Sequence, residues 1–329
     1  MAKEGNRLDA NRITETLPPG AARANAATRT GLGKRFRESR FLLLLVLPCI
    51  VYFILFHYVP MFGIAISFQK YNLFKGIWHS EWVGFHYYEM FFSNPDFFKL
   101  LRNTFLLGLY RIVFGFPAPI VLALLLNELR SAVFRRLVQS VSYLPHFISN
   151  VVVVSMIIVF LSPSGGLVNR LIEMVGFEPV NWLMSPDWFR TIYVGSGIWQ
   201  GVGWSSIIYL AALTAIDPHL YEAAEMDGAG RFRKMFHISL PGIMQTVVVL
   251  LILDIGHVLG IGFEKVFLLY NPATYETADI ISTYVYRVGL VQGNYSYAAA
   301  IDLFTGVVNL AFLLGANYVS RKLGENSLW

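Results

Sequence analysis

Residues 217–241 read DPHLYEAAEMDGAGRFRKMFHISLP, a polar segment that lies between two long apolar stretches. Its first half has the marks of a short helix. Asp217 can accept hydrogen bonds from the first free amides, Pro218 suits the first helical turn, and Gly228 can end the helix in a left-handed conformation. We therefore expect a short helix within residues 217–230, held between two helices that cross a membrane.

The composition of the whole chain favours a membrane protein. Of its 329 residues, 55% are hydrophobic and 14% are charged, and the mean hydropathy is +0.53. An average soluble domain carries about 25% charged residues. We predict an all-α integral membrane protein with six transmembrane helices, because six apolar segments are each near the roughly 20 residues needed to cross the hydrocarbon. These segments are residues 41–67, 104–126, 141–161, 191–214, 243–262 and 299–319.

The basic residues predict the orientation of these helices, since Lys and Arg accumulate in cytoplasmic loops. The segments on the side of the two termini hold 17 of the 26 Lys and Arg, and the opposite loops hold 8. We therefore expect both the N- and the C-terminus in the cytoplasm. Residues 1–40 are basic and poor in large apolar side chains, which predicts a mobile cytoplasmic arm before a membrane domain at residues 41–329. The net charge of +5 is explained by this topology, so we expect no nucleic acid partner.

The polar segment also carries a family signature. The pattern E-A-A, three residues, G, nine residues, I-x-L-P is matched at every fixed position, by Glu222, Ala223, Ala224, Gly228, Ile238, Leu240 and Pro241. Over nearly all of its membrane region the chain resembles the permeases of type I binding-protein-dependent ABC importers. In that family the motif forms the coupling helix, which docks in a cleft of the ATPase subunit and transmits its closure to the membrane helices. The resemblance gives this role to residues 222–228, with Asp227 as a carboxylate at the edge of the helix.

Two further segments narrow the resemblance. Residues 70–77, KYNLFKGI, and residues 82–85, WVGF, are similar to sugar-type permeases, and most of all to those of the alginate importer type. The resemblance implies that the chain forms half of the path for an oligosaccharide, with alginate or a related acidic glycan as the expected cargo.

The chain has no phosphate-binding loop of its own. The closest run, at residues 31–34, has Thr28 where the first glycine belongs and Arg35 where Ser or Thr belongs. We therefore expect a chain that is not an enzyme and binds no cofactor or metal, with ATP and Mg on a separate ATPase. The resemblance implies a second homologous permease in a heterodimer, two ATPase subunits and an extracytoplasmic sugar-binding protein at the cell inner membrane.

Candidate cargo contacts lie in the two spans beside the polar segment, where the resemblance places the sugar site. An ionisable side chain inside the bilayer costs about 2.5–3.5 kcal/mol and usually has a function. Asp254 and His257 share a helix face, and Asp254 can hold His257 by a hydrogen bond, although a clamp between helices explains them equally well. Trp199, Gln200 and Trp204 lie among glycines and can contact sugar rings, while close helix packing explains the glycines equally well.

Arg111, inside the second span, is a further candidate. It can attract an acidic glycan, extend to the membrane surface, or pair with a carboxylate such as Asp302. The loops at residues 68–102 and 263–298 are the candidates for contact with the binding protein, and the first is rich in aromatic residues.

Two other classes of protein compete with the importer. An ion-gradient-driven secondary transporter could use Asp254 and His257 as a proton relay, but the complete coupling motif argues against it. A membrane-bound enzyme such as a glycosyltransferase needs a metal-ligand cluster or a nucleophile triad in a loop of adequate size, and the sequence contains neither.

Overall fold

The computed structural model describes residues 40–322, with side chains from Leu44 onward. The predicted basic arm lies outside these residues except for Arg40. The chain divides into two units, Met1–Phe62 and Gly63–Trp329. The described part of the first unit contains α2 (Arg40–Phe53), the π-helical turn η2 (Ile54–Tyr58) and α3 (Val59–Met61).

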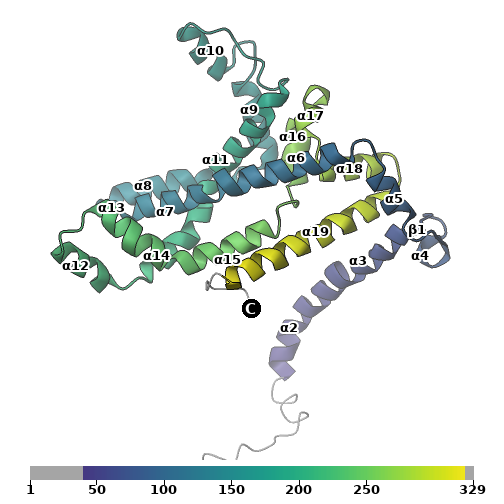
Figure 1. Cartoon of the computed structure of the whole chain (residues 1–329), viewed down its shortest axis with the longest axis horizontal. Coiled ribbons are helices and arrows are strands. Elements are labelled where there is room, and N and C mark those ends of the chain that lie inside the picture. The colour runs from purple at the N-terminus through teal and green to yellow at the C-terminus, as the bar shows by residue number, and fades with distance from the viewer. Residues whose placement is uncertain (1–39, 323–329) are drawn as a thin grey trace, which may run out of the picture. The chain divides into compact units, whose positions relative to one another are not determined.

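The second unit is almost entirely helical (Figure 1). After the 3-10 helix η3 (Phe62–Phe68), its first half contains β1 (Gln69–Lys70), α4 (Gly76–His79), β2 (Glu81–Trp82), α5 (His86–Phe92), α6 (Phe97–Tyr110), η4 (Arg111–Gly115), α7 (Pro117–Asn127), α8 (Ala132–Tyr143), η5 (Leu144–Phe147), α9 (Asn150–Phe160) and α10 (Leu167–Met174). Its second half contains α11 (Pro186–Thr214), α12 (Pro218–Met226), α13 (Arg231–Lys234), η6 (Met235–Ser239), α14 (Leu240–Gly242), α15 (Met244–Ile255), α16 (Phe263–Leu269), η7 (Pro272–Thr274), α17 (Tyr275–Ala278), α18 (Ile281–Tyr286), η8 (Arg287–Val291) and α19 (Tyr295–Lys322).

Among residues 40–322, three helices are long and apolar enough to cross a membrane, and two bent pairs of helices raise the number to five if each pair is one span. The three are Leu44–Phe68, Phe97–Asn127 and Tyr295–Lys322. The bent pairs are Ala132–Phe147 with Asn150–Phe160, at 101°, and Arg231–Gly242 with Met244–Ile255, at 60°. Within the described residues, length and composition therefore support three of the six predicted spans, and five if each bent pair is one span.

The predicted fourth span, residues 191–214, lies in the single helix α11. This helix is 29 residues long, and at 1.5 Å per residue it is easily long enough to cross a bilayer. It is absent from the candidate spans because glycine, serine and glutamine dilute its apolar character. A helix that packs against its own chain, rather than against lipid, tolerates such a composition.

Prolines explain where the helices change their winding. The π turns η2, η4 and η6 each end two residues before a proline, at Pro60, Pro117 and Pro241. The amide of Phe116, for example, donates to the carbonyl of Arg111, five residues back, at 3.1 Å. A proline ring clashes with the carbonyl four residues before it, and a wider turn relieves this clash.

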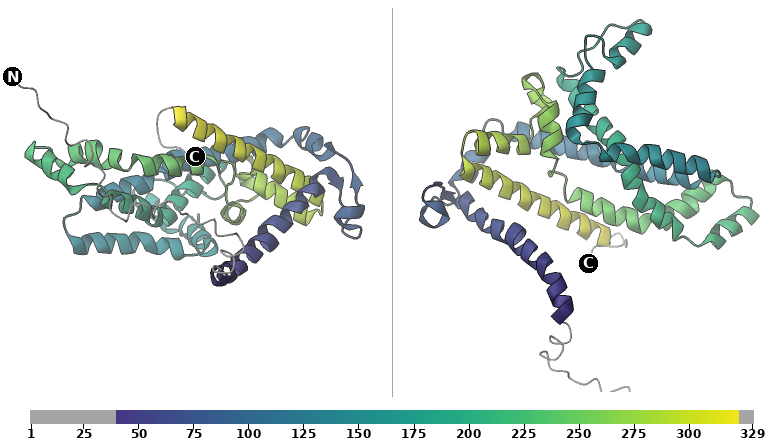
Figure 2. Two further views of the ribbon diagram at one scale, coloured as in Figure 1. Left: turned by 90° about the horizontal axis from the view of Figure 1, so that it is seen from below. Right: turned by 180° about the vertical axis from the view of Figure 1, so that it is seen from behind.

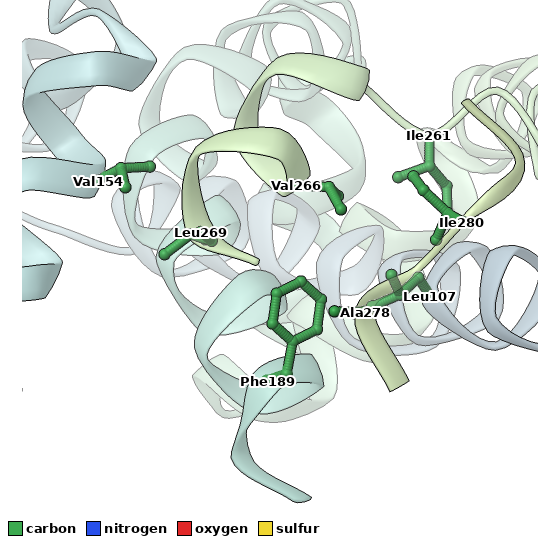
Figure 3. Close-up of a cluster of buried hydrophobic side chains, with 8 residues drawn as sticks. All are labelled: Leu107, Val154, Phe189, Ile261, Val266, Leu269, Ala278 and Ile280. Carbon is green, nitrogen blue, oxygen red and sulfur yellow. The ribbon is translucent and has the colours of Figure 1, made fainter. Parts of the chain in front are cut away.

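The helices pack around three buried clusters. One contains Leu107, Val154, Phe189, Ile261, Val266, Leu269, Ala278 and Ile280 (Figure 3). These side chains come from α6, α9, α11, α16 and α17 and from the segments before α16 and α18, so the cluster fixes the short helix α16 against longer ones. A second cluster joins α7, α11 and the segment before α15, and α15 lies beside α19 in Figures 1 and 2.

Candidate functional site: a protruding helix and a polar cavity

The polar segment folds as predicted into the short helix α12. The carboxylate of Asp217 accepts a hydrogen bond from the His219 amide at 2.9 Å, and Pro218 occupies the first turn. Gly228 has a φ of +72°, and the amide of Ala229 donates to the carbonyl of Ala224 at 2.8 Å. Both ends of the helix are therefore fixed by local chemistry.

None of the residues of α12 is buried, and it lies at one end of the second unit beside α13 (Figure 1). Met226 is 89% exposed, and Leu220 and Phe232 are also exposed. The Glu222 carboxylate lies 3.2 Å from the imidazole of His219, and both side chains face solvent. Exposed apolar side chains among carboxylates form a surface that suits a protein partner.

The second half of the motif joins α12 to the start of the next span. The ammonium of Lys234 lies 2.5 Å from the Glu225 carboxylate, and this contact lowers the pKa of Glu225. The hydroxyls of Tyr221 and buried Ser239 are 3.0 Å apart. These contacts connect α12 to α13 and η6.

The three apolar residues at the end of the motif lie in the segment that connects α12 to α15. Ile238 is part of η6, while Leu240 and Pro241 form the short helix α14. Leu240 packs against the cluster that contains Ile243. The spacing of the motif thus has a structural counterpart, because the exposed helix α12 is followed by α13, η6 and α14, which lead into α15.

A cavity of about 870 Å³ lies between η4, α7, α11, α15 and α16. Among the predicted path residues, Arg111, Trp204, Asp254 and His257 line it. Gln200 lines a smaller neighbouring hollow, where its amide donates to the carbonyl of Ile148 at 3.0 Å, and Trp199 lines neither. Four of the six predicted residues thus meet at one site.

Arg111 and Asp254 form an ion pair across this cavity. The guanidinium Nη2 lies 2.7 Å from the Asp254 carboxylate, and about a third of each side chain is exposed. Of the alternatives for Arg111, pairing with a carboxylate is the one that the structure shows, but the partner is Asp254 and not Asp302. An arginine on one span and an aspartate on another satisfy each other when they meet at the same depth.

The predicted hydrogen bond between the side chains of Asp254 and His257 is wrong, and the two residues share only a backbone bond from the His257 amide to the Asp254 carbonyl at 3.1 Å. The Nδ1 atom of His257 lies 2.8 Å from the backbone carbonyl of Leu253, one turn earlier on the helix. α15 ends at Ile255, so His257 lies in the turn that follows and not on a continuing helix face. The three-residue spacing could not reveal this end of the helix.

Trp204 lies parallel to the imidazole ring of His146, with the ring centres 4.7 Å apart. His146 belongs to η5, at the bend between α8 and α9, and the sequence did not single it out. Stacking holds the indole in place at the cavity wall, since Trp204 is also a cavity residue.

The glycines of α11 serve both of the roles that the sequence left open. A Cβ at Gly203 would lie 2.1 Å from the carbonyl oxygen of Ser142, so this glycine permits close packing of α11 on α8. Gly197 and Gly201 line the cavity. Gly195 has open space around it.

The sequence reasoning missed other lining residues, among them Tyr193, Tyr209 and Lys265. Lys265 is a lone lysine in the apolar run FEKVFLL, which was the available signal. Burying the charged ammonium group of such a lysine is costly unless an opposite charge or hydrogen bonds compensate for the lost water.

The two predicted docking loops are joined by hydrogen bonds. The Ser296 hydroxyl donates to the carbonyl of Gln69 at 2.6 Å and accepts from the amide of Tyr71 at 2.9 Å. The amide of Asn94 donates to the hydroxyls of Tyr284 and Tyr297. Beside these contacts the small hairpin β1–β2 presents exposed aromatic side chains, namely Phe74, Trp78, Trp82 and Phe85.

Comparison with known proteins defines the class of this molecule. Residues 115–325 match the family described as "Binding-protein-dependent transport system inner membrane component". The chain belongs to this family, and within the described residues it contains no cluster of His, Cys, Asp or Glu that could hold a metal ion.

Individual relatives cover most of the chain. It is 48% identical over 293 residues to Protein LplB of Bacillus subtilis (strain 168), covering 89% of this chain and 92% of the relative. It is 50% identical over 292 residues to the polygalacturonan/rhamnogalacturonan transport system permease protein YteP of the same organism, covering 89% and 91%. Among solved structures it is similar, with a TM-score of 0.83 and 42% identity, to a chain of a bacterial alginate ABC transporter in complex with alginate pentasaccharide-bound periplasmic protein. That similarity covers 90% of this chain and 99% of the other.

Proposed function

We propose that this chain is the permease subunit of an ATP-driven oligosaccharide importer and couples to a separate ATPase through residues 222–228. The observation that carries the proposal is the exposed helix α12, capped at both ends and tied by Tyr221 and Lys234 to the base of the next span. A stiff helix that is free on one side and anchored on the other is suited to pass a movement between subunits.

The proposed assembly contains a second, homologous permease, two ATPase subunits that bind ATP and Mg, and an extracytoplasmic binding protein. Family membership and the similarity to an alginate transporter solved with its periplasmic protein support such partners. We place the chain in the inner (cytoplasmic) membrane, with six spans that include α11 and with both termini in the cytoplasm. The joined loops at residues 68–102 and 263–298 then face the binding protein.

The proposed cargo is an oligosaccharide, with an acidic glycan such as alginate or polygalacturonan as the preferred class. The names of similar proteins support this choice, since one imports alginate and another polygalacturonan or rhamnogalacturonan. The cavity with Arg111, Trp204, Asp254 and His257 forms this chain's wall of the path. Aromatic rings and charged groups in one concave site are typical of ligand sites, and the volume falls within the roughly 300–1,000 Å³ range of such sites.

The coupling role is tested in the whole transporter, purified with its partners and reconstituted in lipid. We expect Glu222→Ala and Gly228→Pro to abolish most of the ATP hydrolysis that sugar-loaded binding protein stimulates. Proline cannot adopt the φ of +72° at position 228, whereas asparagine tolerates it. Gly228→Asn is therefore the matched control and should retain stimulation, as should Glu178→Ala at an exposed site far from the motif.

Unchanged stimulation in both Glu222→Ala and Gly228→Pro, with the complex intact by size-exclusion chromatography, would reject the coupling role. Full sugar transport by this chain without any ATPase would favour the ion-gradient-driven transporter instead.

A further inference from the structure

Lys265 is a buried lysine without a hydrogen-bond or ion-pair partner in the described structure. The residue is 8% exposed, and its ammonium nitrogen has no hydrogen-bond partner. The residue nevertheless lines the cavity. Burying an ammonium group without compensation is unfavourable, so an anion in the cavity would be strongly favoured.

Several contacts hold Lys265 at the cavity. Its neighbours Val266 and Leu269 are buried in the cluster of Figure 3, which fixes α16. The ammonium nitrogen lies 5.7 Å from the centre of the Tyr193 ring. A Cβ at Gly197 would lie 3.8 Å from this nitrogen, so the absence of a side chain at position 197 leaves room beside it.

The charges of the cavity lining do not balance. Arg111 and Asp254 neutralise each other at 2.7 Å, which leaves Lys265 as the uncompensated charge among the described lining residues. Arg111 also retains a buried Nε donor without a partner. The lining therefore holds one cation without a counter-charge, with which a carboxylate can pair.

We infer that Lys265 binds the carboxylate of a uronate residue and makes this path selective for acidic over neutral oligosaccharides. The inference rests on the proposed importer function and adds the residue that recognises the cargo's charge. Burial lowers the pKa of Lys265 to about 8, so the group remains largely cationic at neutral pH and can meet an anion. Tyr193 and Trp204 provide aromatic faces against which a sugar ring can pack.

The test is direct sugar binding to the complete transporter in nanodiscs, without binding protein, by equilibrium dialysis of labelled trigalacturonate and of its neutral methyl ester. Lys265→Met removes the charge and keeps the length of the side chain, whereas Lys265→Arg keeps the charge. Lys322→Met, an exposed lysine at the end of α19 and outside the cavity, is the matched control.

We expect Lys265→Met to weaken binding of trigalacturonate at least tenfold while leaving the methyl ester unchanged. Lys265→Arg and Lys322→Met should bind both sugars nearly as the native chain does. An equal loss for both sugars would overturn the inference, because it would indicate damage to packing and not loss of charge recognition.

An unchanged affinity for trigalacturonate in Lys265→Met would also overturn it, and would indicate that a carboxylate of the second permease neutralises Lys265. Uptake by the same preparations separates this failure from failure of the proposed function. A native complex that performs ATP-driven uptake but shows no charge preference rejects only the role of Lys265.

Discussion

At the scale of single residues, the ion pair between Arg111 and Asp254 neutralises two of the charges that line the cavity. It joins the second predicted span to the fifth, and its members lie 2.7 Å apart with about a third of each side chain exposed. The sequence identified both residues but not their pairing, because 143 positions separate them and their meeting depends on how two helices pack.

Removal of one partner should destabilise the protein more than removal of both. Arg111→Met alone leaves a carboxylate unpaired and Asp254→Asn alone leaves a guanidinium unpaired, whereas the double variant leaves neither charge. We expect a coupling energy between about 0.5 and 3 kcal/mol from a double-mutant cycle of thermal unfolding in detergent. Strictly additive effects would show that the pair contributes nothing.

Lys265 should make the binding of acidic sugar depend on pH. Its pKa is lowered to about 8 by burial, so its charge, and with it the attraction for a carboxylate, is lost as the pH rises through this value. The ionisable groups around it are Tyr193 from α11, Arg111, Asp254 and His257 in the same cavity lining, and Glu264 beside it on α16, while α9 has no ionisable side chain.

We expect trigalacturonate affinity to fall at least threefold between pH 7 and pH 9 in the native chain. The neutral methyl ester should bind equally at both pH values, and Lys265→Arg should remove the dependence because arginine stays charged. The same fall in Lys265→Arg would assign the titration to another group.

At the scale of single elements, the glycines of helix α11 serve two roles, since some permit close packing and others line the cavity. Gly203 permits contact with α8, while Gly197 and Gly201 open the wall of the cavity. The substitution to alanine therefore has opposite consequences at different positions of the same helix.

Gly203→Ala should be strongly destabilising and Gly195→Ala should not. The new Cβ at position 203 would lie 2.1 Å from a backbone oxygen, which cannot rotate away, and we expect a loss of more than about 3 kcal/mol. At position 195 open space surrounds the new methyl group, and alanine should add roughly 0.5–1 kcal/mol to helix stability. Thermal unfolding of both variants in detergent measures the difference, and similar midpoints would contradict this packing.

Elements fixed by neighbouring residues could be predicted from the sequence, and those fixed by distant ones could not. The helix α12 is determined by Asp217, Pro218 and Gly228, so its existence and bounds were predicted well. The end of α15 before His257 and the position of Lys265 depend on contacts with α9, α11 and α19, and periodicity contains no information about these. The span at residues 191–214 was predicted from the sequence and lies in the helix α11, although glycine and polar residues keep α11 out of the candidate spans of the structure.

At the scale of the whole molecule, the proposed orientation places α12 and the hairpin β1–β2 on opposite sides of the membrane. The chain has one cysteine, Cys49, so Cys49→Ser gives a background without thiols. Met226 is 89% exposed and Phe74 is fully exposed, which makes both positions suitable for a single new cysteine.

In intact cells, a membrane-impermeant maleimide should label Phe74→Cys on the Cys49→Ser background and leave Met226→Cys unlabelled. In inside-out vesicles the pattern should reverse. Labelling of both positions from the same side would reject the proposed topology.

The most direct test of the importer function is uptake of labelled trigalacturonate into proteoliposomes that contain this chain, a second permease and the ATPase, with ATP inside and binding protein outside. We predict uptake that requires ATP hydrolysis and is lost when the ATPase is omitted or when Glu222→Ala is introduced. Uptake that persists without the ATPase and follows an imposed proton gradient would contradict the proposal.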